Sequence, residues 1–433
     1  APLPGAPPRP GYCTQGDVQR KYDGWERALP RVAPFYAVKC NNDERILDTL
    51  AAAGAGFDCA SKAELAAVVA RGVPRDRIIF AHPCKPVSHL KYAQAVGVEH
   101  MTFDNLDELH KVKAHFPAAK LVLRILVDDS YAVCRLGIKF GAPPADAPAL
   151  LDAAHALGLT VVGISFHVGS GCTNARAFSV AVETVVPAFA HGRALGFPMT
   201  LLDVGGGFPG QSDAPVAFAD IARELTAALD LHFPADAPDN AGLRVIAEPG
   251  RYFVASACSL AVHVMAKRTG TTADGRVHHD YYVNDGVYGS FNCILFDHQV
   301  VVPQVLVGPP AADAPDHDQC TIWGPTCDSM DCITPNGRLP ELSVGDWLVF
   351  DNMGAYTLAA SSTFNGFARP ALQYIFSTPR AAALGSLALP PTPPETPPAD
   401  PAHHGVPVPP AYWRAVDLVI LADHHHDVNE PAR

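Results

Sequence analysis

The sequence has few charged residues and no long hydrophobic run. Lys, Arg, Asp and Glu make up 18% of its 433 residues, and the formal net charge is -12. An acidic chain without a basic cluster is not expected to bind nucleic acid. No apolar run approaches the roughly 18 residues that a membrane-spanning helix needs. Composition therefore favours a globular protein of two or three domains that binds no nucleic acid and does not span a membrane. Its acidity would suit a cationic substrate.

Paired cysteines are also missing. The 11 cysteines are scattered along the chain, and no two of them form a CxxC pair. This pattern indicates reduced thiols in a cytoplasmic protein rather than a disulfide framework. The histidines of the segment 423–427 are adjacent and lack the spacing of a preformed metal site. We therefore expect a solvated tail there and no metal.

From about residue 33, strand-like apolar runs alternate with segments of helical character. Eight such strand–helix units over roughly 220 residues are typical of a (β/α)8 TIM barrel. A doubly wound open sheet is the alternative, but no GxGxxG motif follows the first predicted strand. The eight strands are predicted at 35–39, 56–61, 77–82, 100–104, 120–127, 160–169, 200–205 and 244–254.

After residue 254, short strand candidates are separated by Gly, Pro and Asn turns, which indicates a mostly β-sheet domain. A Pro-rich segment follows and leads to the His-rich tail. The strands of the second domain are predicted at 257–266, 279–283, 300–307, 319–323 and 346–350. The predicted divisions are a tail that could add a strand to the β domain (1–32), the barrel (33–254), the β domain (255–377), and the Pro-rich segment with the His-rich tail (378–433).

One lysine stands at the end of the first predicted barrel strand. Lys39 follows the apolar run 34–38 and precedes a polar turn. The carboxyl ends of barrel strands form the mouth at which sites are built. Burial lowers the pKa of an amine there, so that it could form a Schiff base with an aldehyde. The alternative is a structural lysine whose amine extends to solvent.

The ends of three later strands supply groups of the kind that hold a cofactor. Glycines let backbone N–H groups approach a phosphate closely, and loops after late barrel strands commonly bind phosphate. Each group alone also has a structural explanation, such as a core histidine or a salt bridge between neighbours. The groups are Gly205, Gly206 and Gly207 after the seventh strand, His167 and Ser170 after the sixth, and Glu248, Gly250 and Arg251 after the eighth.

Together these groups match what pyridoxal 5'-phosphate requires. Lys39 would hold the aldehyde, and the glycines with Ser170 and Arg251 would hold the phosphate. His167 could stack on the ring, and Glu248 could keep the pyridine nitrogen protonated. A protonated pyridine ring is a full electron sink, which suits the breaking of a Cα–carboxylate bond. The sequence therefore predicts a decarboxylase.

Five motifs resemble those of the barrel-type, pyridoxal-phosphate-dependent amino acid decarboxylases. They lie at 36–41, 57–61, 167–171, 205–210 and 248–252. Two more, at 282–292 and 323–328, narrow the resemblance to the eukaryotic-type ornithine decarboxylases. The resemblance runs in chain order from about residue 19 to residue 376. It implies an alanine-racemase-like barrel followed by a β domain, and a head-to-tail homodimer.

The resemblance implies roles for further residues. Asp58 and Arg124 would set the lysine and the cofactor, and Tyr356 would contact the phosphate. Cys327 would return a proton to the carbon that loses CO₂. Two of the implied substrate-binding residues are acids that would receive the distal ammonium, and one is an aromatic that would close the site across the dimer. The substrate-binding set is Asp297, Asp328, Tyr288 and Phe364.

The activity implied by the resemblance is decarboxylation of L-ornithine to putrescine, the first step of polyamine biosynthesis, by a cytoplasmic homodimer. A decarboxylase of lysine or arginine is an alternative, whereas the acids Asp297 and Asp328 do not suit diaminopimelate, which has a distal carboxylate. A catalytically inactive relative that binds a regulator, like the antizyme inhibitors, is another. Such relatives lose residues corresponding to Asp58, Arg124 or Asp328, all present here. An antizyme-like regulator is a further expected partner.

Overall fold

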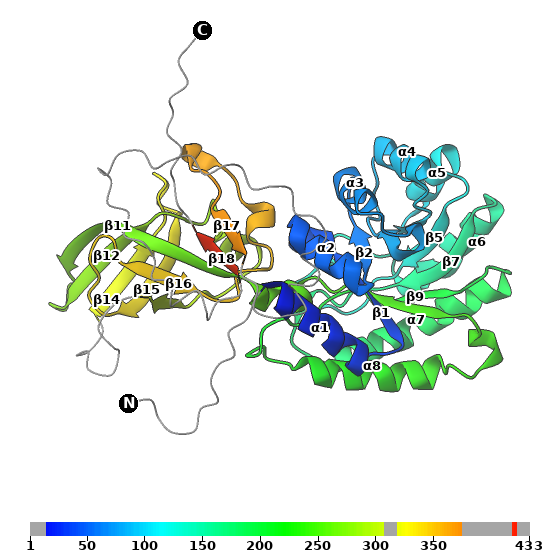
Figure 1. The fold of residues 1–433 in the computed structure, drawn as a ribbon. Helices are drawn as coiled ribbons and strands as arrows, with labels where there is room; N and C mark the ends of the chain where they lie inside the picture. Colours follow the sequence, from blue (N-terminus) through cyan, green and yellow to red (C-terminus); the bar gives the residue numbers. More distant parts are fainter. Residues whose placement is uncertain (1–13, 307–317, 375–417, 422–433) are drawn as a thin grey trace, which may run out of the picture. The chain divides into compact units, whose positions relative to one another are not determined.

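The structure is a computed structural model that describes residues 14–306, 318–374 and 418–421. The chain divides into two compact units, one of residues 18–255 and one that joins the segment ending at Asp17 to the residues from Ser256 onward. Each unit is built around its own sheet (Figure 1). No helix within the described ranges is long and apolar enough to cross a membrane.

The unit of residues 18–255 is a closed barrel of eight parallel strands in the order β1-β10-β9-β7-β5-β4-β3-β2. Strand β1 pairs with both β2 and β10, so the predicted barrel is confirmed and the open-sheet alternative is wrong. Each predicted strand is present, and several end earlier than predicted. The strands are β1 (Val32–Ala37), β2 (Gly56–Cys59), β3 (Ile78–Phe80), β4 (His100–Phe103), β5 (Lys120–Arg124), β7 (Thr160–Ser165), β9 (Leu201–Asp203) and β10 (Arg244–Ala247).

Helices connect successive strands and cover the outside of the barrel (Figure 1). The first of these helices, α2, shows how the sequence sets its two ends. The Asp43 side chain accepts hydrogen bonds from two backbone N–H groups at the start of α2, and Gly54, with φ of 107°, ends the helix. The connecting helices are α2 (Glu44–Ala53), α3 (Lys62–Ala70), α4 (Val87–Val96), α5 (Leu106–His115), α6 (Ala147–Ala156), α7 (Arg176–Ala194) and α8 (Phe218–His232).

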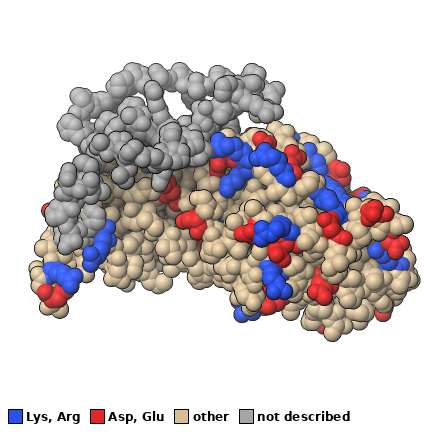
Figure 2. All heavy atoms as spheres, turned by 90° about the horizontal axis from the view of Figure 1, so that it is seen from below, with Lys and Arg blue, Asp and Glu red and all other residues tan. Residues whose placement is uncertain are grey.

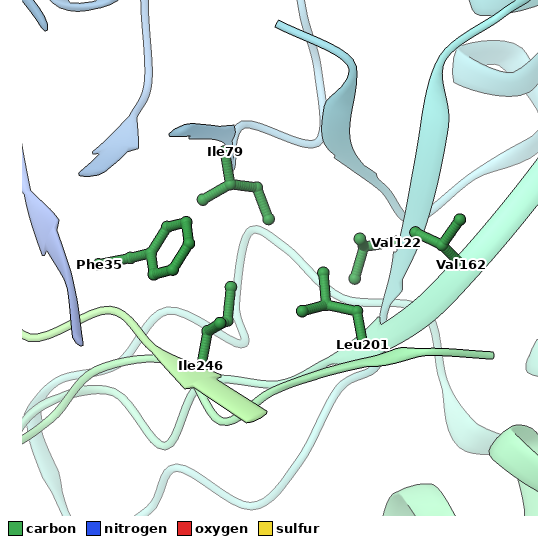
Figure 3. Close-up of a cluster of buried hydrophobic side chains, with 6 residues drawn as sticks. All are labelled: Phe35, Ile79, Val122, Val162, Leu201 and Ile246. Carbon is green, nitrogen blue, oxygen red and sulfur yellow. The ribbon is translucent and has the colours of Figure 1, made fainter. Parts of the chain in front are cut away.

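A cluster of buried apolar side chains fills the barrel (Figure 3). Its members are Phe35, Ile79, Val122, Val162, Leu201 and Ile246. Side chains alternate between the two faces of a strand, so residues two positions further along face the same interior, nearer the carboxyl ends. Those positions hold Arg124 after Val122 and Asp203 after Leu201. The interior therefore gains charged side chains toward the carboxyl-terminal mouth.

The other unit contains an eight-stranded sheet in the order β13-β16-β11-β12-β14-β15, with β18 beside β11 and β17 beside β18. The five predicted strands correspond to β11, β12, β13, β14 and β16. The strands are β11 (Ser259–Thr271), β12 (Val277–Val283), β13 (Pro303–Val305), β14 (Asp318–Trp323), β15 (Cys332–Leu339), β16 (Trp347–Phe350), β17 (Ala371–Tyr374) and β18 (Leu418–Leu421).

The described residues of the range 1–32 contain a helix, α1 (Thr14–Ala28), and the start of β1. The strand that this range could add to the β domain stays a prediction, because part of the range lies outside the described residues. Within α1, the Trp25 indole N–H donates to the Val32 carbonyl at 2.7 Å, and its ring packs edge-on against Phe208. Residues 1–13 lie outside the described residues, as do the Pro-rich segment and the His-rich tail except for β18.

Charged side chains of both signs lie on the molecular surface. On the face drawn in Figure 2, basic and acidic side chains are interspersed. Surfaces that bind nucleic acid instead present a patch or stripe of one sign. The charge pattern of this face is that of an ordinary solvated surface.

Candidate active site

Lys39 lies at the carboxyl mouth of the barrel, in a single 3-10 turn, Val38–Cys40, directly after β1. Its Nζ is 2.5 Å from Oδ2 of Asp58 on β2. The Lys39 side chain is 42% exposed, whereas that of Asp58 is only 1% exposed. The other carboxylate oxygen of Asp58 has no hydrogen-bond partner among the described residues. A buried carboxylate thus holds an amine that stays accessible to an incoming aldehyde.

The loop after β9 has a backbone shape that requires glycine. Gly205 has φ of 65°, and a Cβ there would lie 2.1 Å from the carbonyl oxygen of Phe166. Gly207 has φ of 109°, and its Cβ would lie 2.7 Å from the carbonyl oxygen of Gly169. Both positions combine a left-handed backbone with a close approach of another backbone segment. The loop is a cradle without side chains, as phosphate binding by backbone N–H groups demands.

Two side chains meet beside the glycine loop. Nη2 of Arg251, the first residue of α9 (Arg251–Val254), donates to Oγ of Ser170 at 3.0 Å. Ser170 begins β8 (Ser170–Cys172), which pairs with β6 (Ala132–Cys134). A Cβ on Gly250 would lie 2.8 Å from Cβ of Cys40, so the segment that carries Arg251 packs tightly against the Lys39 turn. A guanidinium and a hydroxyl at this position suit a phosphate.

His167 follows β7 and carries a neutral ring. Its Nδ1 accepts a hydrogen bond from the Gly169 N–H at 2.9 Å, which leaves the ring proton on Nε2. Burial lowers the pKa of His167 well below its usual 6.5, and the positive charges of Arg124 and Lys39 act in the same direction. A Cβ on Gly206 would lie 2.8 Å from Nε2. The uncharged ring therefore lies against the glycine loop and can stack on a flat ligand.

Glu248 follows β10 and has a second buried acid as its neighbour. Burial raises the pKa of Glu248 well above its usual 4.5, and the charges of Asp203 and Asp58 add to this effect. Burial also raises the pKa of Asp203, to about 7. Asp203 was not among the residues that sequence patterns singled out. Its only sequence signal is its position before the glycine run.

The predicted residues of the barrel lie together at one mouth. Arg124, at the end of β5, completes them, with its guanidinium 5.4 Å from the centre of the Phe140 ring. The accessible amine fits the aldehyde of pyridoxal phosphate, and the glycine cradle with Arg251 and Ser170 fits its phosphate. The neutral His167 ring fits the cofactor ring, and the buried acid Glu248 fits the ring nitrogen. The donor set thus matches the group that the sequence predicts.

The other predicted residues lie in the β-sheet unit. The Tyr288 hydroxyl donates to Oδ2 of Asp328, and the rings of Tyr288 and Phe364 are 4.4 Å apart. The Cys327 N–H donates to Oδ1 of Asn365 at 3.2 Å, and Cys327 is exposed. A hydrogen bond from the Met330 N–H, followed by that from Tyr288, lowers the pKa of Asp328. The structure thus brings Tyr288, Asp328 and Phe364 together, with Cys327 adjacent in sequence.

Asp331 supports this loop, although no sequence pattern marks its role. It is fully buried and accepts hydrogen bonds from the Val287 N–H at 2.8 Å and from the Thr326 N–H and hydroxyl at 3.0 and 2.7 Å.

Two predicted residues of the β-sheet unit remain. Asp297 directly follows α10 (Asn292–Phe296) and is 8% exposed. Tyr356 has φ of 55°, an uncommon conformation for a residue with a side chain.

Residues 15–255 match the family described as "Pyridoxal-dependent decarboxylase, pyridoxal binding domain". The chain belongs to the pyridoxal-dependent decarboxylases. Pyridoxal phosphate is accordingly the cofactor of this decarboxylase, and the residues at the barrel mouth fit it. The resemblance of the motifs to the eukaryotic-type enzymes is confirmed by relatives about half identical over most of the chain.

Three relatives show the extent of the similarity. The ornithine decarboxylase of Mus pahari is 52% identical, over 84% of this chain and 80% of its own. Antizyme inhibitor 2 of Xenopus laevis is 50% identical, over 85% and 80%. The crystal structure of the Paramecium bursaria Chlorella virus arginine decarboxylase aligns with a TM-score of 0.77 and 37% identity, covering 82% of this chain and 92% of that one.

Proposed function

We propose that this decarboxylase converts L-ornithine to putrescine and CO₂, the first step of polyamine biosynthesis. The observation that carries the proposal is the pairing of Lys39 with buried Asp58 beside the glycine cradle. It occurs in a chain 52% identical to an ornithine decarboxylase over most of the length of both proteins.

The barrel residues bind and orient the cofactor. Bound pyridoxal phosphate would supply the electron sink that breaking a Cα–carboxylate bond requires. Lys39 holds the aldehyde and Asp58 orients the amine. Ser170, Arg251 and the glycine loop would hold the phosphate, and Tyr356 is a further residue proposed to contact it. Because the His167 ring is neutral, it packs on the cofactor ring without adding a positive charge.

Residues of the β-sheet unit act on the substrate. Asp297 and Asp328 receive the distal ammonium of ornithine, since a buried ammonium without a negative partner is costly. Tyr288 holds Asp328 through its hydroxyl. Cys327 donates the proton that replaces the lost carboxylate, and Phe364 closes the site.

The active form in this proposal is a cytoplasmic homodimer in which each site takes Lys39 from one copy and Cys327 from the other. Large apolar side chains at or close in sequence to the predicted substrate-binding residues are exposed. They are Phe296 at 70%, Met330 at 61% and Phe364 at 43%. Such exposed apolar side chains on one unit support contact with another protein surface. A second copy of this chain is the partner that the shared site requires.

CO₂ release from ornithine, lysine and arginine, measured side by side with and without added pyridoxal phosphate, tests the proposal. We expect cofactor-dependent release, fastest from ornithine. Faster release from lysine or arginine would reassign the substrate.

No release from any of the three would favour the alternative, a regulatory binding protein, which the 50% identity to an antizyme inhibitor supports. An antizyme-like protein is then the partner to assay for binding. Binding of that protein without any CO₂ release would support the regulatory alternative, because binding does not require catalysis.

A further inference from the structure

Two buried carboxyl groups occupy the ends of neighbouring barrel strands. Asp203 ends β9 and is fully buried, and Glu248, 9% exposed, directly follows β10. Asp203 is paired with Ile246, so Glu248 lies one pleat further along on the same inner face. The Gly205 N–H donates to Oδ1 of Asp203 at 2.9 Å.

The two carboxyl groups are neighbours on adjacent strand ends. Oδ2 of Asp203 is buried and has no hydrogen-bond partner among the described residues, and Glu248 is a carboxyl group that acts on Asp203. An ionised carboxylate has no hydrogen to donate, so the two groups can hydrogen-bond to each other only when one of them carries a proton. Two buried carboxyl groups on adjacent strand ends favour the state in which only one of them is ionised.

The charges around the pair balance when it holds one proton. Asp58 from β2 faces it with a negative charge, and Lys39 and Arg124 face it with positive charges. His167 adjoins it through Gly206 and is neutral. In the cofactor-free protein, these groups carry two negative and two positive charges when the pair shares one proton; with no proton on the pair they carry an excess negative charge, which the burial of the pair makes costly.

We propose that Asp203 is a positioning residue that shares one proton with Glu248. The pair, and not Glu248 alone, then presents a single negative charge to the pyridine nitrogen of the bound cofactor. The inference rests on the proposed role of Glu248. With the proton on Asp203, the Glu248 carboxylate can accept the N–H of the ring. The pair keeps a charge of -1, which offsets the positive ring, and no proton enters or leaves.

The infrared absorption of a buried protonated carboxyl, recorded on the holoenzyme near neutral pH, tests this directly. Wild type should show the band, and labelling aspartate side chains with carbon-13 should shift it. Asp203→Asn, which is nearly isosteric, should abolish it. Ser165→Ala is the matched control, because Ser165 is buried on β7, directly opposite Asp203, and does not titrate. A wild-type band that aspartate labelling does not shift would overturn the proposal.

Pyridoxal phosphate dissociation as a function of pH gives a second measurement. In Asp203→Asn, the amide donates to the Glu248 carboxylate more weakly than the protonated Asp203 carboxyl does, so Glu248 should take up a proton more readily. The loss of affinity on the acid side should therefore move to higher pH by about one unit. The Ser165→Ala profile should overlay that of wild type.

The variant Glu248→Gln separates this inference from the proposed function. If it binds pyridoxal phosphate like wild type at every pH, the proposed role of Glu248 fails. If it is impaired while the Asp203→Asn profile overlays wild type, only the sharing of the proton is refuted. Either result is independent of whether ornithine is the substrate.

Discussion

Substituting alanine for Gly205 tests whether the glycine cradle is a requirement of the barrel itself. A Cβ at Gly205 meets the carbonyl oxygen of Phe166 at 2.1 Å, and a carbonyl of the backbone cannot rotate away. Gly196, two residues after the end of α7, has φ of 84° but no atom within 4 Å of its Cβ. The two glycines share a left-handed backbone and differ in the clash, so Gly196→Ala is a matched control.

The expected magnitudes follow from these two contributions. A left-handed backbone costs a residue with a side chain about 1–2 kcal/mol, which is the expected loss for Gly196→Ala. Forcing extra atoms into a packed site adds about 1–3 kcal/mol. Gly205→Ala should therefore lose about 2–5 kcal/mol. Because domains are stable by about 5–15 kcal/mol, both variants should retain folded protein.

Urea unfolding of the cofactor-free variants measures the difference. Gly206→Ala extends the series, because its φ is not left-handed while its Cβ meets the Glu248 carbonyl oxygen at 2.7 Å and Nε2 of His167 at 2.8 Å. We expect it to lose less stability than Gly205→Ala and to bind pyridoxal phosphate more weakly, since the His167 ring must move. Equal losses for Gly205→Ala and Gly196→Ala would refute the steric argument.

Two further predictions concern the substrate and the dimer. Asp297→Asn should cost about 2–5 kcal/mol in kcat/KM for ornithine, because the distal ammonium loses a negative partner; an unchanged kcat/KM would mean that the ammonium binds elsewhere. Mixing the inactive Lys39→Ala with the impaired Cys327→Ala protein and allowing subunit exchange should restore roughly a quarter of wild-type activity. Half of the dimers are then mixed, and each has one intact site of two. No recovery despite demonstrated exchange would place both residues in one chain.

The barrel could be predicted because its strands are buried on both faces and separated by helices of regular period. The ends of the strands were less predictable. The predicted run 244–254 stops at Ala247, because Pro249 has no N–H to continue the ladder and α9 begins at Arg251. The strand predicted to end with Lys39 stops at Ala37, and the lysine lies in a 3-10 turn.

Strand β15 shows what local patterns conceal. It contains Pro335, Asn336 and Gly337, a sequence typical of a turn. The register with β14 shifts twice in this region, and the Pro335 carbonyl accepts a hydrogen bond from the Thr321 hydroxyl at 3.1 Å. Pairing with β14 therefore overrides the local preference, which no count of turn residues could reveal.

Asp203 was missed for a different reason. As a lone acid before three glycines it has an ordinary place at a strand end, and its importance lies in its pairing with Glu248, which follows the next barrel strand along the chain. Only the register of β9 against β10 brings the two together. Buried carboxyl groups cost stability, and apolar side chains at these two positions would pack better. Asp203 and Glu248 lie among the predicted cofactor residues, where charge must be held rather than avoided, so these two buried acids are explained by the chemistry of the site and not by the needs of the fold.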